Sequence, residues 1–167
     1  MPRMTVPLLL VAVACDQPKT PPIPVPPPLG SPAAVAPAGE IEGAAFADSL
    51  HVDLKASTKN ASGLYSRDLT VGTGPEVTKG QQVSVHYAGW LPNGTSFDKS
   101  GPTDPALTFT VGAGRVIPGW DEGLVGMRVG GKRQLIIPPA LGYGASGNGP
   151  IPPNAVLVFT VDLVSVK

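Results

Sequence analysis

The stretch VIPGWDEGLVGM, residues 116–127, carries the one strong helical pattern in a region that otherwise reads as β-strands. Trp120, Leu124 and Met127 are spaced so that a helix would bring them to one face. Pro118 suits the first turn of a helix, because its missing N–H has no partner there in any case. The stretch therefore predicts one short helix with a tryptophan on its apolar side.

Strands are predicted on both sides of this helix. In QVSVHYAGWL, residues 82–91, apolar and polar side chains alternate and Tyr87 lies on the apolar face, as in a half-buried strand. Asn93-Gly94 is a strong hairpin signal and places TSFD, residues 95–98, on the antiparallel return strand. Further strands are predicted in GLYSRDLTVGTG (63–74), ALTFTV (106–111), KRQLIIP (132–138) and AVLVFTVDLVSVK (155–167).

These elements together predict an α+β fold in which a curved antiparallel β-sheet is wrapped around one short α-helix. The chain has 167 residues, 42% of them hydrophobic and 14% charged, which is enough for one modest core. Its formal net charge is zero and neither sign forms a run. Nucleic-acid binders, which depend on a basic surface, are excluded as a class.

The first residues, MPRMTVPLLLVAVAC, are organised like an export signal. Arg3 precedes an apolar run that leads into Cys15, the only cysteine of the chain. The run is shorter than the roughly 20 residues that a membrane span needs. We therefore expect a lipoprotein-type signal peptide over residues 1–15, lipidation of Cys15 as the membrane attachment, and a periplasmic location. A cleaved secretory signal, or a misassigned start, is the alternative.

A proline-rich segment and a lead-in follow the signal. Residues 16–39 are crowded with proline and are predicted to form a linker, which could extend on the order of 70 Å as polyproline II. A ligand for a proline-reading domain is the rival interpretation. Residues 40–63 are predicted to form a short amphipathic lead-in to the domain. Its apolar residues have roughly helical spacing: Ile41, Ala45, Phe46 and Leu50.

Three stretches of the chain together resemble the FKBP-type peptidyl-prolyl cis-trans isomerases. They are VSVHYAGWLPNGTSFDKS (83–100), VGAGRVIPGWDEGLVGMRVGGKRQLIIPPALGYG (111–144) and GPIPPNAVLVFTVDL (149–163). The resemblance runs in order from about Leu64 to Lys167, so the isomerase domain is expected over residues 64–167. It implies that family's fold and its activity, rotation about X–Pro peptide bonds.

The resemblance also implies a site. Trp120 would be the floor of a pocket that receives the proline ring, and Tyr143 would donate its hydroxyl to a substrate carbonyl. The backbone N–H of Ile117 would be a second donor, and Asp98 would line the rim. The walls would be formed by Tyr87, Phe97, Val116, Ile117 and Phe159.

Two positions affect the pocket that the resemblance implies. Leu107 stands where many family members have an aromatic residue, which makes one edge of the pocket aliphatic. Ile151 is the main hydrophobic residue of the loop that follows Tyr143. The resemblance implies X–Pro segments of unfolded or exported proteins as substrates and macrolides as inhibitors, although Leu107 puts macrolide affinity in question.

Such a site needs no nucleophile, metal or cofactor. The barrier to X–Pro rotation, roughly 18–20 kcal/mol, comes from the partial double bond of the amide. An apolar pocket that removes water from the prolyl carbonyl favours the less polar, twisted amide. His51 and His86 are accordingly interpreted as surface or packing residues. The alternative function is a noncatalytic proline-binding or holdase module on the same fold.

Overall fold

The structure is a computed structural model that describes residues 41–167. The predicted signal peptide, the lipidation site Cys15 and the proline-rich linker lie outside the described residues. No helix within the described part of the chain is long and apolar enough to cross a membrane.

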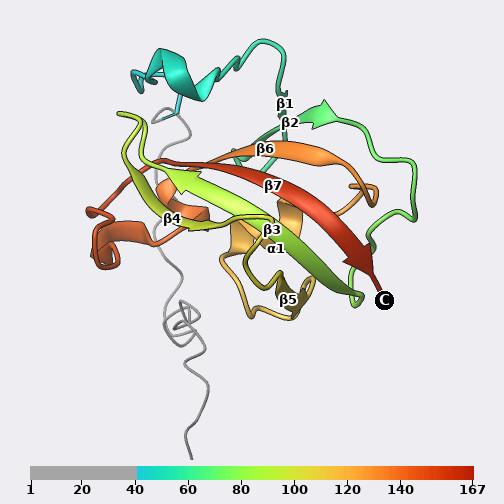
Figure 1. Cartoon of the computed structure of the whole chain (residues 1–167). Coiled ribbons are helices and arrows are strands. Elements are labelled where there is room, and N and C mark those ends of the chain that lie inside the picture. Colours follow the sequence, from blue (N-terminus) through green and yellow to red (C-terminus); the bar gives the residue numbers. More distant parts are fainter. Residues whose placement is uncertain (1–40) are drawn as a thin grey trace, which may run out of the picture.

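A seven-stranded antiparallel sheet dominates the fold (Figure 1). All of its pairings are antiparallel, and α1 lies on its concave face. The expected fold class is thus confirmed. Along the main path the strands are β1 (Thr58–Lys59), β2 (Tyr65–Thr70), β6 (Lys132–Ile137), β7 (Leu157–Val166), β3 (Gln82–Trp90) and β4 (Ser96–Ser100), while β5 (Leu107–Thr110) pairs with β3 beside β4.

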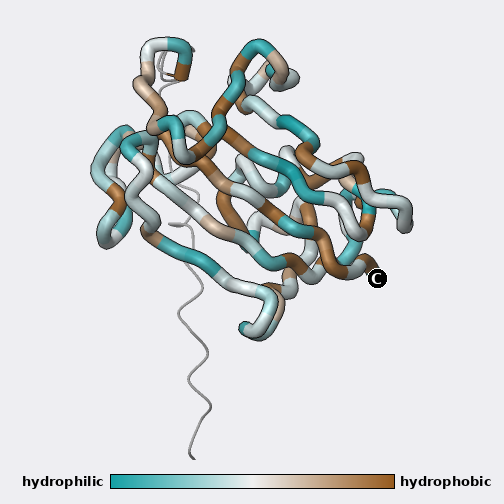
Figure 2. The backbone as a smooth tube through the Cα atoms, turned by 45° about the horizontal axis from the view of Figure 1, so that its top comes forward, coloured by the Kyte–Doolittle hydropathy of each residue, from teal (hydrophilic) through white to brown (hydrophobic). Residues whose placement is uncertain are grey.

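Alternation along the strands gives the sheet an apolar inner face. In β3, Val83 and Val85 are fully buried, whereas Ser84 between them is partly exposed. In β7, Phe159 and Val161 are buried in the same core. Hydrophobic and hydrophilic residues alternate along the tube in Figure 2. In β3, burial of one face and partial exposure of the other fixes the register of the strand.

The hairpin between β3 and β4 forms where Asn93-Gly94 predicts it. The Gly94 N–H donates to the Leu91 carbonyl over 2.9 Å, and the Leu91 N–H donates to the Thr95 carbonyl over 2.8 Å. Gly94 has a φ of 86°, the left-handed conformation that this kind of loop requires.

Helix α1 (Pro118–Gly123) is shorter than its sequence pattern suggests. The predicted helical stripe was wrong for its second half, since Leu124 caps the helix and Met127 lies beyond it. Both side chains are nevertheless buried. Glycines bring the helix close to β6: a Cβ on Gly119 would lie 2.6 Å from Ile137. Close packing onto the sheet, rather than length, therefore stabilises this helix.

The lead-in is not the amphipathic helix that the spacing predicts. It contains one 3-10 turn, η1 (Asp48–Leu50), and the two-residue strand β1. Its apolar side chains pack on the outer face of the sheet instead, where they form a second small core. This core consists of Ile41, Tyr65, Ile136 and Val156, with Phe46, Val52 and Leu54 packed against it. Tertiary burial has overridden the helical pattern.

Two further 3-10 turns lie in the connection from β6 to β7. They are η2 (Pro139–Leu141) and η3 (Gly144–Ser146), which flank Tyr143.

Candidate active site

Aromatic side chains gather where α1 meets the inner face of the sheet. The ring of Trp120 lies 5.1 Å from that of Tyr87 and 5.3 Å from that of Phe159, both nearly edge-on, at interplanar angles of 77° and 85°. The Phe97 ring meets Phe159 at 5.4 Å and 85°. Phe109 from β5 closes the group 5.8 Å from Trp120. Edge-to-face contacts of this kind hold rings in fixed orientations.

Each ring comes from a different element. Tyr87 lies on β3 and Phe159 on the neighbouring β7, where Phe159 is opposite Gly89. Trp120 projects from α1 beneath them and is only 4% exposed. The structure thus brings together five aromatic rings from five different elements.

A β-bulge turns two consecutive residues of β4 toward the same side. Gly89 pairs with Asp98 and Trp90 pairs with Ser96, so Phe97 is the additional residue. In a regular strand Phe97 and Asp98 would face opposite sides of the sheet. Here the Phe97 ring contacts Phe159, and Asp98 reaches Tyr87. A bulge beside an active site commonly redirects a side chain in this way.

Gly89 makes room for these rings. A Cβ at this position would lie 2.7 Å from both Phe97 and Phe159. Real Cβ atoms do not approach other atoms so closely, so only glycine fits without displacing an aromatic ring. Sequence reasoning missed this residue, because a glycine inside a strand gives only a general signal of close approach.

The polar groups of the site are few. The Tyr87 hydroxyl donates to Asp98 Oδ2 over 2.7 Å. Burial, and then the neighbouring Asp98 carboxylate, raise the pKa of Tyr87 far above its ordinary range. Burial also raises the pKa of Tyr143. Both phenols therefore stay protonated at neutral pH and can act as hydrogen-bond donors.

The remaining expected site residues line the same region. Val116 and Ile117 are buried just before α1, and Ile117 is its N-cap residue. Leu107 and Tyr143 are half-buried and pack against the core that contains Trp120. Ile151 is 6% exposed and belongs to that core, so it is less accessible than a loop-tip residue would be.

Asp121 holds the loop that precedes Val116. Its two carboxylate oxygens accept the Gly112 and Gly114 N–H groups over 2.7 and 3.0 Å. No pattern in the sequence predicts this contact between Asp121 and the loop. It ties the β5–α1 loop to the helix that carries Trp120.

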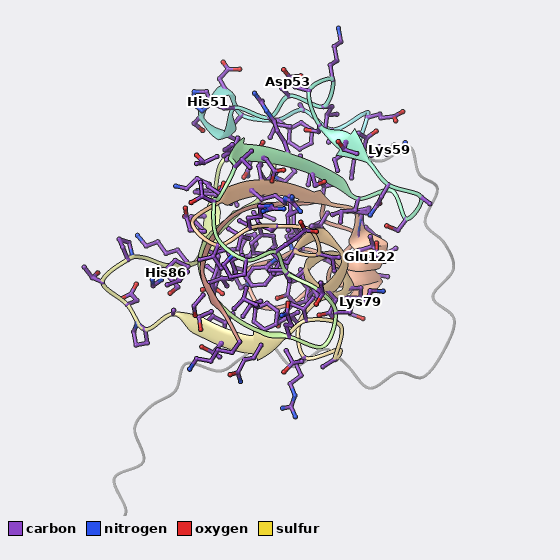
Figure 3. All side chains as sticks on the ribbon, turned by 90° about the vertical axis from the view of Figure 1, so that its right-hand side faces the viewer. His51, Asp53, Lys59, Lys79, His86 and Glu122 are labelled. Carbon is purple, nitrogen blue, oxygen red and sulfur yellow. The ribbon has the colours of Figure 1, made fainter. Side chains whose placement is uncertain are left out.

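The two histidines lie apart from the aromatic group. His86 projects to one side and His51 lies on the lead-in, at the edges of the view in Figure 3. The only side-chain neighbour of His86 within hydrogen-bond range among residues 41–167 is Ser100, at 3.5 Å. The described residues contain no group of three His, Cys, Asp or Glu side chains placed to hold a metal ion.

An apolar, aromatic site with protonated phenols and no nucleophile suits a reaction that breaks no covalent bond. A family model described as FKBP-type peptidyl-prolyl cis-trans isomerase matches residues 74–164. The chain belongs to this family. The expected activity, peptidyl-prolyl cis–trans isomerisation, is thereby confirmed. As an FKBP-type enzyme, the protein acts on X–Pro peptide bonds.

Relatives of this FKBP-type enzyme agree with the assignment. An FK506-binding protein of Neisseria meningitidis serogroup B is 54% identical over 105 residues, which cover 62% of this chain and 96% of that protein. The crystal structure of a peptidyl-prolyl cis-trans isomerase from Pseudomonas syringae is similar with a TM-score of 0.62 and 34% identity, covering 83% of this chain and 99% of that one. The crystal structure of AtFKBP13 is similar with a TM-score of 0.62 and 42% sequence identity. The match covers 66% of this chain and 98% of that one.

Proposed function

We propose that isomerisation takes place in the aromatic pocket over Trp120. The observation that carries this proposal is the contact of Trp120 with Tyr87 and Phe159 at 5.1 and 5.3 Å, which builds a rigid apolar floor from three elements. The proline ring of a substrate would rest on this floor. The pocket residues of the proposal are Tyr87, Phe97, Asp98, Trp120, Tyr143 and Phe159, with Leu107, Val116, Ile117 and Ile151 around them.

The chemistry is selective binding of a twisted amide. A planar X–Pro amide is polar because its resonance form separates charge, and water stabilises that form. In an apolar pocket the prolyl carbonyl loses its water, which costs the planar states more than the twisted state. An enzyme that binds the twisted state more tightly than either planar state lowers the barrier without a covalent step.

Two donors would bind the peptide on either side of the rotating bond. The Tyr143 hydroxyl lies in a half-buried position with a raised pKa. The Ile117 N–H donates to no acceptor among residues 41–167. Each would bind a substrate carbonyl, while the Tyr87 hydroxyl already donates to Asp98.

The setting of the reaction is part of the proposal. The apolar run before Cys15 supports export and lipidation, and the proline-rich residues 16–39 support a spacer between membrane and enzyme. Substrates would then be X–Pro segments of other exported proteins in the periplasm. A macrolide would bind in the same pocket, and the aliphatic Leu107 would weaken one edge of that contact.

Exchange spectroscopy by NMR on an X–Pro peptide tests the activity at this site. Catalytic amounts of the protein should produce cis–trans exchange within the experiment, where the free peptide exchanges over tens of seconds or longer. A macrolide added at saturation should abolish it. Exchange that persists in a Trp120→Ala variant at the wild-type rate would refute the pocket, and peptide binding without exchange would favour a noncatalytic module.

A further inference from the structure

Residues 41–54, here called the strap, cross the outer face of the sheet and contact, at Ala47 and Ser49, the tip of the hairpin that carries Phe97 and Asp98. Figure 1 shows the η1 turn of the strap next to the β3–β4 loop, and Figure 3 shows His51 and Asp53 on the side of the molecule that the strap covers. The strap thus contacts this hairpin from outside the sheet pairing.

Three contacts hold the strap down. Its apolar side chains, among them Ile41, Phe46 and Val52, belong to the second core on the outer face. The Gln134 side chain, 3% exposed, donates from Nε2 to the Leu50 carbonyl over 2.8 Å. Glu42 accepts from the Tyr65 hydroxyl over 2.7 Å. The strap is therefore fixed to β6, near the centre of the sheet, and to β2, on the side of the sheet far from β4.

From that fixed base the strap reaches the hairpin loop. The Ala47 N–H donates to the Pro92 carbonyl over 2.8 Å. Gly94 is so close that a Cβ on it would lie 3.2 Å from the Ala47 Cβ and 3.3 Å from the Ser49 hydroxyl. This contact joins the tip of the β3–β4 hairpin to an element anchored elsewhere in the molecule.

The hairpin needs such support. β4 is an edge strand that pairs only with β3, and its bulge at Phe97 interrupts the ladder. Phe97 and Asp98 follow the tip by a few residues, so the angle of the hairpin sets where the Phe97 ring and the Asp98 carboxylate lie. We propose that the strap is a positioning element whose Ala47–Pro92 hydrogen bond holds the β3–β4 hairpin, and with it Phe97 and Asp98, at the pocket. This inference rests on the proposed function of those two residues.

The Ala47→Pro substitution tests the proposal by breaking the contact between the strap and the hairpin. Ala47 has a φ of −64° and a ψ of 138°, which proline adopts, but the proline Cδ replaces the amide hydrogen and cannot lie 2.8 Å or less from the Pro92 carbonyl, so the hydrogen bond is lost and the hairpin tip must move away. In the full chain, kcat/KM on an X–Pro peptide should fall about two- to tenfold, the range that one hydrogen bond supports. The backbone amide signals of Phe97 and Asp98 should shift, while the indole N–H signal of Trp120 should not.

Two matched controls separate positioning from stability. Ala47→Ser retains the N–H and should leave kcat/KM unchanged. Glu42→Gln weakens the strap at its other end, on Tyr65 and Lys59, and should change the melting temperature more than kcat/KM. If Ala47→Pro matched Ala47→Ser, or if Glu42→Gln lowered kcat/KM as much as Ala47→Pro, the proposal would be overturned.

A second variant and a reference variant complete the test. If Ala47→Pro does not fold, Gln134→Met takes its place, because it removes the hydrogen bond to the Leu50 carbonyl. This variant should shift the same amide signals, those of Phe97 and Asp98. Unshifted signals would overturn the proposal. Phe97→Ala is measured in parallel. Full activity of Phe97→Ala would contradict the proposed pocket, whereas a defect there combined with a normal Ala47→Pro would contradict the strap alone.

Discussion

At the scale of single residues, the proposed site would act through its shape and its exclusion of water more than through any reactive group. Tyr87 and Tyr143 keep their protons because burial raises the pKa of both, so neither can serve as a base at neutral pH. Asp98 is occupied by the Tyr87 hydroxyl. The strongest effects of substitution are therefore expected at the rings that exclude water.

Phe97→Ala and Tyr143→Phe test this ranking. Loss of the Phe97 ring admits water beside the prolyl carbonyl and removes apolar contact of a few kcal/mol, so kcat/KM should fall by more than about twentyfold. Loss of the Tyr143 hydroxyl removes one donor, and kcat/KM should fall about two- to twelvefold. Both variants are measured on one X–Pro peptide, with thermal melts as the control for folding. A larger defect in a folded Tyr143→Phe would mean that hydrogen bonding, not desolvation, carries catalysis.

Gly89→Ala should displace the aromatic rings of the proposed pocket from the side of the sheet. The new methyl group would overlap Phe97 and Phe159, each 2.7 Å from the added Cβ, and one ring must move. Overpacking of this kind costs about 1–3 kcal/mol, so we expect a lower melting temperature together with weaker catalysis. Gly101→Ala is the matched control, because its added Cβ would meet only Asp104 at 3.5 Å. Wild-type kcat/KM in Gly89→Ala would show that the rings can rearrange freely.

At the scale of elements, the sequence located the strands and the helix but not the irregularities that build the site. Alternation in residues 82–91 and the Asn93-Gly94 turn predict β3 and its hairpin, because both signals are local. The bulge at Phe97 has no local signature, since it depends on the register of β4 against β3. The family resemblance indicated that Phe97 and Asp98 share one site, and the bulge explains how neighbours on a strand can do so.

The helix predicted for the lead-in is also absent because of contacts that the local sequence does not show. Ile41 and Leu50 have helical spacing, but the outer face of β6 is apolar and exposes Ile136 to the lead-in. The lead-in therefore packs on this face instead of forming a helix. Length was overestimated in α1 as well. Gly126, with a φ of 78°, leaves the helical conformation, and the tight approach of Gly119 and Gly123 to β6 leaves space for only a short helix.

Asp121→Asn should loosen the connection between β5 and α1. The asparagine keeps one oxygen acceptor, so one of the Gly112 and Gly114 N–H groups loses its partner. We expect shifted amide signals at both glycines and a loss of about three- to tenfold in kcat/KM, because Val116 and Ile117 follow this loop. Glu122→Gln is the control on the same helix, since Glu122 binds Asn60 and Ser62 instead. Unchanged glycine signals in Asp121→Asn would contradict this role.

At the scale of the whole molecule, the described body includes more than the expected domain of residues 64–167. The strap covers the outer face, so the chain from residue 41 onward forms one packed unit with a core on each side of the sheet. Catalysis and attachment are assigned to separate parts of the chain. The residues of the proposed pocket lie on the inner face, and the proposed lipidation site lies in the N-terminal segment that precedes the strap.

This separation makes a prediction about Trp120→Ala and Cys15→Ser. Removing the indole opens the pocket floor, where Trp120 contacts Tyr87, Phe109 and Phe159, so kcat/KM on a soluble X–Pro peptide should fall by more than about twentyfold. Cys15→Ser removes only the proposed attachment point and should leave that rate unchanged while the protein moves from the membrane fraction to the soluble fraction. Because a soluble peptide reaches the pocket whether or not the enzyme is tethered, equal losses in the two variants would show that attachment and catalysis are not independent. A Cys15→Ser protein that stayed in the membrane fraction would instead refute lipidation at Cys15 and leave the pocket unaffected.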